Sequence, residues 1–406
     1  MSDFQSQLDA WLARLAEAQP RARHLLSVSH EIQQEEGYFH TLREICQQPL
    51  SWPSTAELVV RNRSRIQSCL DGILNIVLTG SGSSEYAGEC VRLDLQERLQ
   101  ITTSVVGGGT LVAHGARAVP PIRPALMVSI ARSGDSPESF AALSLFLQSD
   151  SAMRHLVLTC NENGKLAAAA SPQVTVLTLD DSTNDRSLVM TSSFTNLVLA
   201  ARGLAYANDS TAYIDLSRKL SDIAAHVLLT YFEKIACIAE TPFRRAVFLA
   251  DSNRLGAARE GALKMLEASA GRIPTMSETY LGFRHGPMSF AHNDALIVCF
   301  LSSDKSLRAF ESDLLHEMRQ KELGMAKIVV GENIPKDILV EGDLAIECPG
   351  LAYVGDQSAP MIDVVIAQLL AFFRSQREGL NPDAPSDGVI NRVVQSFQMH
   401  FRGVNQ

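Results

Sequence analysis

Helical spacing of apolar residues marks the start of the chain. One apolar stripe recurs every three to four residues, and it consists of Phe4, Leu8, Trp11, Leu12 and Leu15. This period predicts an amphipathic helix. The prolines of QQPLSWPST interrupt the pattern, and a helical pattern restarts with Ser54 as its expected N-cap. The sequence therefore predicts a helical arm over residues 1–52.

From residue 75 onward the hydrophobic pattern changes. Short, nearly continuous apolar runs rich in β-branched residues alternate with loops and longer helical patterns. Such runs are typical of parallel strands that helices cover on both faces. We expect strands at 75–80, 102–107, 125–130, 155–160 and 174–179, and a second series at 246–251, 295–300, 326–331 and 344–349.

The two series match at one constant offset, which brings Ala125 onto Ala295. ALMVSIARSGDS (125–136) aligns without gaps with ALIVCFLSSDKS (295–306) and shares five residues with it. Two further pairs align in the same order: IVLTGSGS (76–83) with AVFLADSN (246–253), and, two residues later, LVL (156–158) with IVV (328–330). Three matching strand–loop units indicate two copies of one module.

These patterns predict an α/β protein with two tandem, doubly wound parallel sheets behind the helical arm. We expect the first sheet domain over residues 53–222 and the second, with a C-terminal tail, over 223–406. A continuous helical pattern over about 203–240 would bridge the two copies. In open sheets of this class, ligands bind at the carboxyl ends of the strands.

Composition narrows the class of protein. The chain has 406 residues, enough for two or three domains, and its 46% hydrophobic and 20% charged residues are those of a globular protein. Its net charge of −9 argues against a nucleic-acid partner, although backbone amides can still build a local anion site.

Cysteine usage and hydropathy point to the cytoplasm. The seven cysteines are scattered and form no C-x-x-C pair, which is typical of reduced thiols. The sequence shows neither a basic, apolar leader nor an apolar run of membrane-spanning length, so we expect no membrane partner.

The loop after the first strand, LTGSGSSEYAGE (78–89), is rich in glycine and serine. Its GSGSSE begins like a dinucleotide-binding G-x-G-x-x-G, but Glu85 stands in place of the third glycine and no acidic residue ends the next strand. The sequence also lacks a G-x-x-x-x-G-K-[ST] loop. NAD and nucleoside triphosphates are therefore not indicated as ligands.

A second polar loop, SIARSGDSPES (129–139), offers Ser133, Gly134 and Ser136 at the start of a predicted helix. Hydroxyls and free amides on such a turn suit one phosphate monoester. The alternative is an ordinary N-cap followed by Pro137. Two such loops on adjacent strands favour the anion site, and a third hydroxyl cluster, VMTSSFT (189–195), also precedes a helix.

Candidate acid–base residues lie in the second copy. Glu260, Lys264 and Glu267 share one helical face, which in most helices is a solvated stripe with a surface ion pair. The functional alternative makes Glu267 a proton-transferring carboxylate, with His285 in LGFRHGP as the group that handles an oxygen. His285 alone is equally consistent with packing. No two histidines have metal-ligand spacing, so we expect no metal.

Taken together, GSGSS, SGDS and EGALKMLE followed by HGP resemble the sugar isomerase (SIS) domains of phosphosugar enzymes, including the isomerase half of glucosamine-6-phosphate synthase. The resemblance covers roughly residues 54–400. HTLREICQQPLSWPST (40–55), LGFRHGP (281–287) and the tail GLNPDAPSDGVINRVVQ (379–395) are most similar to the AgaS branch. Members of that branch are described as galactosamine-6-phosphate deaminases or as tagatose-6-phosphate ketose/aldose isomerases.

The resemblance assigns roles to individual residues. It implies that Glu267 moves a proton between C1 and C2 of the sugar, that His285 opens the ring, often across a dimer interface, and that Lys264 belongs to the catalytic group. The residues that match substrate- and phosphate-binding positions are Ser81, Ser83, Ser84, Arg132, Ser133, Ser136, Thr191 and Ser192. The chemistry that it implies uses no cofactor.

Two departures from the synthase matter. The glutamine-hydrolysing domain is absent, and Asp387 or a neighbour replaces the C-terminal lysine that forms a Schiff base there. The resemblance therefore implies conversion of galactosamine 6-phosphate to tagatose 6-phosphate and ammonia, by a homodimer or higher homo-oligomer. Glucosamine-6-phosphate deamination and plain ketose/aldose isomerisation remain alternatives, as does a non-catalytic sugar-phosphate-binding regulator.

Overall fold

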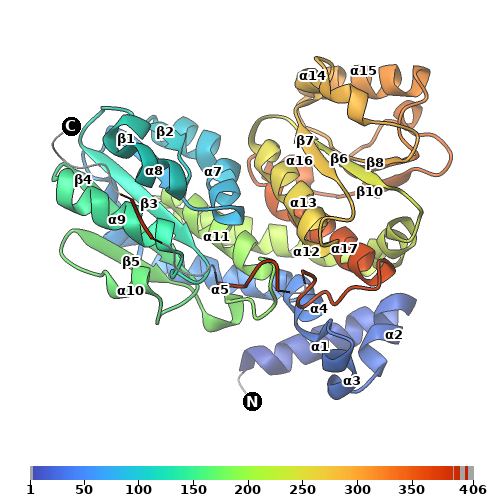
Figure 1. The fold of residues 1–406 in the computed structure, drawn as a ribbon, viewed down its shortest axis with the longest axis horizontal. Coiled ribbons are helices and arrows are strands. Elements are labelled where there is room, and N and C mark those ends of the chain that lie inside the picture. Colours follow the sequence, from blue (N-terminus) through green and yellow to red (C-terminus); the bar gives the residue numbers. More distant parts are fainter. Residues whose placement is uncertain (1–2, 387, 394–397, 401–406) are drawn as a thin grey trace. The chain divides into compact units, whose positions relative to one another are not determined.

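The computed structural model describes residues 3–386, 388–393 and 398–400 (Figure 1). The chain forms two compact units. The first-sheet unit comprises Ser51–Asp185, Ser192–Ser217 and the chain from Val389 onward. The second-sheet unit comprises the chain up to Leu50, Arg186–Thr191 and Arg218–Gly388.

The first-sheet unit contains a five-stranded parallel sheet in the order β2-β1-β3-β4-β5. Its strands are β1 (Asn75–Thr79), β2 (Thr102–Val105), β3 (Ala125–Ala131), β4 (Met153–Thr159) and β5 (Val174–Thr178). Its helices are α7 (Ser83–Leu99), α8 (Gly108–His114), α9 (Pro137–Ser149), α10 (Lys165–Ala168) and α11 (Ser192–Arg202). Helices α8 and α9 pack on one face, where Phe146 meets Val77 and Met127, and α7 and α11 pack together on the other (Figure 1).

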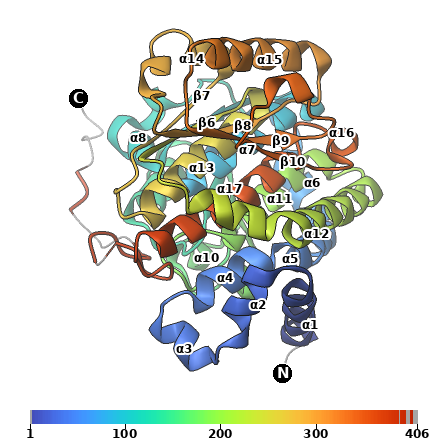
Figure 2. The ribbon, with the colours of Figure 1, turned by 90° about the vertical axis from the view of Figure 1, so that its right-hand side faces the viewer.

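The second-sheet unit repeats this architecture with the order β10-β9-β8-β6-β7. Its strands are β6 (Arg245–Leu249), β7 (Thr275–Glu278), β8 (Ala295–Phe300), β9 (Ala326–Gly331) and β10 (Leu344–Glu347). Its helices are α13 (Leu255–Ala268), α14 (Tyr280–Phe283), α15 (Lys305–Gln320), α16 (Leu351–Val354) and α17 (Pro360–Arg377). Helices α14 and α15 cover one face, and α13 packs on α17 across the other (Figure 2).

The predicted repeat is present in the strand register. β1 pairs with β3 through Asn75↔Ala125, and β6 pairs with β8 through Arg245↔Ala295, so the offset that relates Ala125 to Ala295 also relates Asn75 to Arg245. The next pairs, Val128↔Leu156 and Val298↔Ile328, show the additional shift of two residues. The prediction of two parallel-sheet modules is confirmed.

One strand escaped prediction. All nine expected strands are present with slightly different ends, but β7 lies in PTMSETY, where only Met276 breaks a polar run. It is an edge strand that pairs with β6 alone, and none of its four residues is fully buried. Because such a strand needs no continuous apolar run, its pattern is weak.

Six helices precede the first sheet: α1 (Asp3–Ala18), α2 (Pro20–Ser27), α3 (His30–Glu35), α4 (Phe39–Cys46), α5 (Gln48–Arg61) and α6 (Arg63–Leu70). The expected restart at Ser54 is wrong, because α5 runs from Gln48 through Pro53 without a break. Pro53 costs one backbone hydrogen bond there, and burial of Trp52 and Ala56 on either side of it offsets that cost.

The apolar stripe of the arm is buried within the second-sheet unit. Leu8, Trp11, Leu12 and Leu15 are at most 7% exposed, and the indole of Trp11 donates to the carbonyl of Cys46. Helix α12 (Ser210–Ala239) occupies the predicted bridging segment. Among the residues that the structure describes, no helix is long and apolar enough to span a membrane.

Candidate active site

The loop after β1 approaches the loop after β2 at the carboxyl edge of the first sheet. The amide of Gly108 donates to the carbonyl of Gly80 at 2.7 Å, and a Cβ on Gly108 would lie 3.1 Å from the Ser81 hydroxyl. Ser81 itself is exposed. Glycine is required at Gly80, because a Cβ there would lie 2.6 Å from the backbone of Ser84. The two loops thus form one close-packed surface with an outward-facing hydroxyl.

Ser83 and Ser84 form the first turn of α7. Both are 6% exposed, and Gly82 precedes them with a φ of +57°, a conformation that favours glycine. This turn directs the first amides of a 17-residue helix toward the sheet edge. The structure therefore places these two serines at a helix N-terminus, where an anion is stabilised.

The loop after β3 lies beside the loop after β1, because β1 and β3 are neighbours. Ser133 is 8% exposed and its hydroxyl accepts from the amide of Asp135 at 3.3 Å. Gly134 has a φ of +68°. Ser136 is the N-cap of α9 but its side chain does not cap the helix. The N-cap followed by Pro137 is therefore present as the alternative described it, but the Ser136 hydroxyl does not cap the helix and lies half-buried at the sheet edge.

Arg132 is held by the C-terminal tail. Its Nη2 donates to the carbonyl of Arg392 at 2.5 Å, and the guanidinium of Arg392 in turn donates to the carbonyl of Asp185 and the side chain of Asn184. Arg132 is 7% exposed. The sequence indicated Arg132 but gave no signal for Arg392, whose partners lie more than 200 residues away.

Ser192 starts α11 and is fully buried. Asp185 accepts hydrogen bonds from its hydroxyl at 2.7 Å and from its amide at 3.1 Å, and also bonds to the amide and hydroxyl of Ser193. Asp185 thus acts as the helix cap. The hydroxyl of Ser192 is engaged in the fold, so its assignment to substrate remains a prediction from the resemblance.

Thr191 belongs to the second-sheet unit and is 1% exposed. Its hydroxyl lies 3.4 Å from Oε2 of Glu44, and its carbonyl accepts from Gln368 at 3.1 Å. A small cavity lies beside it. The cavity is lined by Thr41, Ile45, Val189, Thr191, Lys264, Ala268, Gln368, Ala371, Phe372 and Pro382. The structure therefore brings together Thr191 and Lys264, which are far apart in the sequence.

Lys264 joins two carboxylates on α13. Its Nζ contacts Oε1 of Glu260 at 3.3 Å and donates a short hydrogen bond to Oε2 of Glu267. Glu260 and Lys264 are 0% and 1% exposed, so the alternative of a solvated stripe is wrong. Burial by itself lowers the pKa of Lys264, but Glu260 and Glu267 outweigh it and raise that pKa. Lys264 is therefore a buried ammonium group.

Glu267 is the exposed end of this triad. Its side chain is 22% exposed, whereas the ammonium that orients it is buried. One oxygen accepts from Lys264, which leaves the other oxygen of the carboxylate toward solvent or a ligand. An oriented, accessible carboxylate on a rigid helix is suited to proton transfer.

His285 lies in the turn between α14 and Pro287. Its amide donates to the carbonyl of Gly282, and Gly286 follows with a φ of +123°. The imidazole is exposed and has no hydrogen-bond partner within the described ranges, and no contact there joins it to Glu267. The His285 side chain therefore does not fill the core of the second-sheet unit. The expected pairing of Glu267 with His285 stays a prediction.

Several site-forming residues carried no sequence signal. Glu44, Asp185 and Gln368 are single polar residues in helical or loop patterns, and only the fold brings them to the hydroxyl clusters. Asp387, which the sequence places opposite the synthase's Schiff-base lysine, lies outside the described residues.

No family model matches the chain. The D-galactosamine-6-phosphate deaminase AgaS of Shewanella sp. is 32% identical over 386 residues, which cover 92% of this chain and 95% of the relative. The protein of that name from Escherichia coli is 33% identical and covers 89% of this chain and 95% of its own. The chain belongs to the AgaS family.

The AgaS assignment agrees with the fold. The crystal structure of tagatose-6-phosphate ketose/aldose isomerase from Escherichia coli superposes with a TM-score of 0.80 at 30% identity, over 89% of this chain and 96% of that one. Two tandem SIS domains, as the sequence predicted, account for the two parallel sheets. The alignments span almost the whole length of the AgaS relatives, so the resemblance extends to both modules.

Proposed function

We propose that this AgaS-family protein is an enzyme that converts galactosamine 6-phosphate and water to tagatose 6-phosphate and ammonia. The observation that carries the proposal is the buried Lys264, which holds the accessible carboxylate of Glu267 at the end of α13. The names of the relatives, which are deaminases and a ketose/aldose isomerase, support the same substrate class.

In the proposed reaction the sugar ring opens in the site, and the open-chain form is the one that reacts further. His285 transfers protons between O5 and O1 as the ring opens. Glu267 then removes the proton from C2, which gives an enaminol, and returns it to C1, which gives the 2-imine. Water adds to C2 of the imine, the C2–N bond breaks, and ammonia leaves with tagatose 6-phosphate as the product. A positioned acid–base group of this kind contributes about 10²–10⁴-fold to the rate.

Lys264 positions the base. Its hydrogen bond to Glu267 limits the rotamers that the carboxylate can adopt. Glu260, fully buried on the preceding turn, balances the lysine's charge from the other side. This arrangement supports a carboxylate that is held in place before substrate arrives.

The 6-phosphate is assigned to the loops of the first sheet. Ser81, Ser83 and Ser84 lie at the N-terminus of α7, and Ser133 and Ser136 lie at that of α9. Both helices are long enough for their terminal dipoles to stabilise an anion. Arg132 supplies the positive charge, and its hydrogen bond to the Arg392 carbonyl is one that a phosphate oxygen can replace. Thr191 and Ser192 complete the set by resemblance.

The test is ammonia release by Glu267→Gln. We expect turnover to fall at least 10²-fold while the Kd for galactosamine 6-phosphate changes little, because glutamine keeps the size of the side chain but cannot accept the C2 proton. Glu341→Gln, at an exposed loop position, is the matched control. Near-normal ammonia release by Glu267→Gln would refute the mechanism.

Two substrate alternatives use the same site. Glucosamine 6-phosphate differs at C4 only, and without an amino group the same proton transfers interconvert aldose and ketose phosphates. Turnover of the two epimers and of tagatose 6-phosphate, measured side by side, ranks the three activities. Binding of all three without turnover would instead favour a sugar-phosphate-binding regulator.

The proposal extends to assembly and location. An exposed His285 is what a residue that acts in a neighbouring subunit would show, and we therefore assign the active form to a homodimer or higher homo-oligomer. The seven free cysteines support our assignment of the protein to the cytoplasm. Mixing Glu267→Gln with His285→Ala subunits tests this. Recovered activity in the mixture supports sharing of residues between subunits, and its absence opposes it.

A further inference from the structure

The loop that follows β4 is bonded to the loop that follows β3. We call residues 132–136, to which we assign the 6-phosphate, the phosphate loop, and residues 160–166 the β4 loop. The backbone bonds that join them run to the carbonyls of Arg132 and Gly134 from the amides of Cys160 and Leu166, at 3.2 and 3.0 Å. The β4 loop therefore holds the phosphate loop on both sides of Ser133.

The side chain of Asn161 binds the carbonyl between these two. Its Nδ2 donates to the carbonyl of Ser133 at 2.8 Å, and its Oδ1 accepts from the amide of Asn163 at 3.1 Å. Both ends of the amide group are thus engaged within the first-sheet unit, so the Asn161 side chain is fixed in one orientation. Three successive carbonyls of the phosphate loop are bound by the β4 loop.

Gly164 lies against the same carbonyl. Its φ of −74° and ψ of 155° are open to any residue, so the backbone conformation does not require glycine. A Cβ at this position, however, would lie 2.3 Å from the carbonyl oxygen of Ser133. Glycine is therefore required by the close approach of the two loops. The Ser133 carbonyl is confined by Gly164 as well as bonded to Asn161.

This confinement decides where the amides of the phosphate loop point. Its peptide bonds are trans, so each carbonyl points away from the amide that follows it. The carbonyls of Arg132 and Ser133 both point to the β4 loop. The amides of Ser133 and Gly134 therefore point to the opposite side, and they have no hydrogen-bond partner in the described part of the chain. Two successive amides on one turn can bind an anion.

Glycine at position 134 makes this orientation easy to lose. A flip of the peptide between Ser133 and Gly134 would exchange its carbonyl and its amide, and it would change the φ of Gly134 from +68°, which glycine accepts at little cost. The flipped peptide would present an oxygen to an anion instead of an N–H. The bond from Asn161 opposes the flip, because it holds the carbonyl on the side of the β4 loop.

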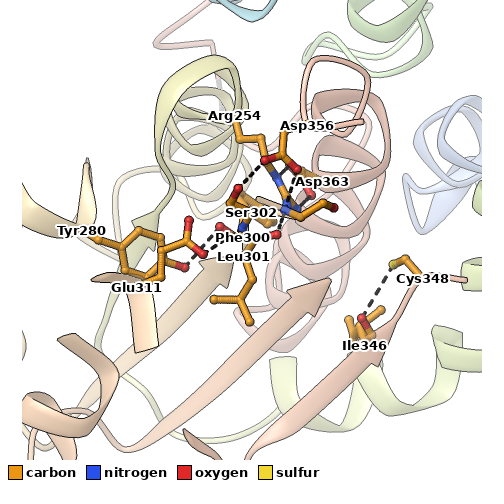
Figure 3. A network of polar contacts seen from close by, with 11 residues as sticks. Arg254, Tyr280, Phe300, Leu301, Ser302, Glu311, Ile346, Cys348, Asp356 and Asp363 are labelled. Carbon is orange, nitrogen blue, oxygen red and sulfur yellow. Dashed lines mark hydrogen bonds and ion pairs between the residues drawn. The ribbon is translucent and has the colours of Figure 1, made fainter. Parts of the chain in front are cut away.

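The loop after β8, which aligns with the phosphate loop in sequence, uses its amides differently (Figure 3). The amides of Ser302 and Ser303 donate to Glu311 and Asp356, each at 2.8 Å. Carboxylates of the second-sheet unit thus take these donors. The comparison favours the phosphate loop of the first sheet as the one that offers its amides to a ligand.

We propose that Asn161 is a positioning residue for substrate binding, which fixes the peptide between Ser133 and Gly134 so that the amides of these two residues face the 6-phosphate. The inference rests on the proposed assignment of the 6-phosphate to this loop. Asn161 itself touches no substrate atom. It acts through the carbonyl of Ser133, and its loss weakens phosphate binding without removing a group that takes part in proton transfer.

The test compares wild type with Asn161→Ala, which removes the donor without adding a charge. Calorimetry gives the Kd for galactosamine 6-phosphate and for inorganic phosphate, and ammonia release gives kcat at saturating substrate. We expect both Kd values to rise together by about 10-fold, because a buried carbonyl loses its partner and the peptide can turn. We expect kcat to change little. Asn163→Ala is the matched control, because this exposed residue bonds to Asn161 through its backbone amide alone.

A second variant disturbs the same peptide by another route. Gly164→Ala keeps Asn161 but displaces the Ser133 carbonyl, so it should raise both Kd values in the same way; one folded variant of the two suffices. A Kd for inorganic phosphate equal to that of wild type, or a loss confined to kcat or to the melting temperature, overturns the proposal. If wild type itself binds neither ligand, the proposed function fails together with it, which separates the two failures.

Discussion

Glu44 of α4 accepts hydrogen bonds from both the amide and the hydroxyl of Ser187, 143 residues away in the sequence. The same carboxylate accepts from the amide of Arg186 at 2.5 Å and lies 3.4 Å from the Thr191 hydroxyl. The C-terminal tail also contacts the arm, because Asp383 caps α4 by accepting from the amide of Thr41. The N-terminal arm thus fixes the segment 186–191 that ends at the candidate active site.

Replacement of Glu44 by alanine should therefore reduce stability and substrate handling together. It leaves several buried donors without a partner, which costs roughly 3 kcal/mol of unfolding free energy. Thr191 loses its support, so we expect KM to rise more than kcat falls. Denaturant unfolding and steady-state kinetics measure the two effects. Glu35→Ala, at an exposed position on α3, should change neither. An unchanged KM would show that the arm has a purely structural role.

The pair formed by Arg254 and Asp363 is almost fully buried. Asp363→Ala should destabilise the protein by about 3–5 kcal/mol, because an uncompensated guanidinium remains in the interior. The double variant Arg254→Met/Asp363→Leu should recover part of this loss, since it leaves no unpaired guanidinium in the interior. For comparison, Glu317→Gln, at a surface group with Arg284 and Lys321, should change the free energy of unfolding little. A double variant as unstable as the single one would contradict this account.

His155 gives the stability a defined pH dependence. Burial in β4 lowers its pKa to about 4, and neither ring nitrogen has a hydrogen-bond partner among the described residues. The unfolded chain, with a histidine pKa of about 6.5, binds the proton more tightly, so stability falls as the pH drops from about 6.5 to about 4. The loss attributable to this residue is about 3 kcal/mol.

The change that tests this is His155→Leu, with unfolding free energies measured at pH 7 and pH 4.5. Relative to wild type, the free energy of unfolding of the variant should be higher at pH 4.5 than at pH 7. His114→Gln, an exposed histidine of the same unit, provides the control. Parallel pH profiles for wild type and His155→Leu would mean that the group titrates normally in the folded state.

His285→Ala should separate ring opening from proton transfer. If the imidazole opens the ring, the variant consumes the open-chain fraction of galactosamine 6-phosphate in a fast phase and then proceeds at the rate of spontaneous ring opening. Wild type shows a single phase. Stopped-flow ammonia detection resolves the two, and His292→Ala, also exposed, serves as the control. A variant with wild-type kinetics on cyclic substrate would remove His285 from the mechanism.

Local and periodic features of this chain were predictable because they depend on neighbours in the sequence. The buried strands have continuous apolar runs, and the repeat appeared as a constant offset between two strand series that the strand register then reproduced. The edge strand β7 was missed because it has no such run. The helix through Pro53 was missed because burial of its flanks, which the sequence does not display, outweighs the proline's local effect.

The sequence by itself determined the two α/β modules, the polar loops at their strand ends and the candidate residues Glu267 and His285. Only the tertiary structure decided which of those polar groups are buried and with whom they pair. It buried Glu260 and Lys264, which the alternative of a solvated stripe would have left exposed, and it paired Ser192 with Asp185. Burial and pairing depend on contacts between residues far apart in the chain, and these contacts carry no periodic signal.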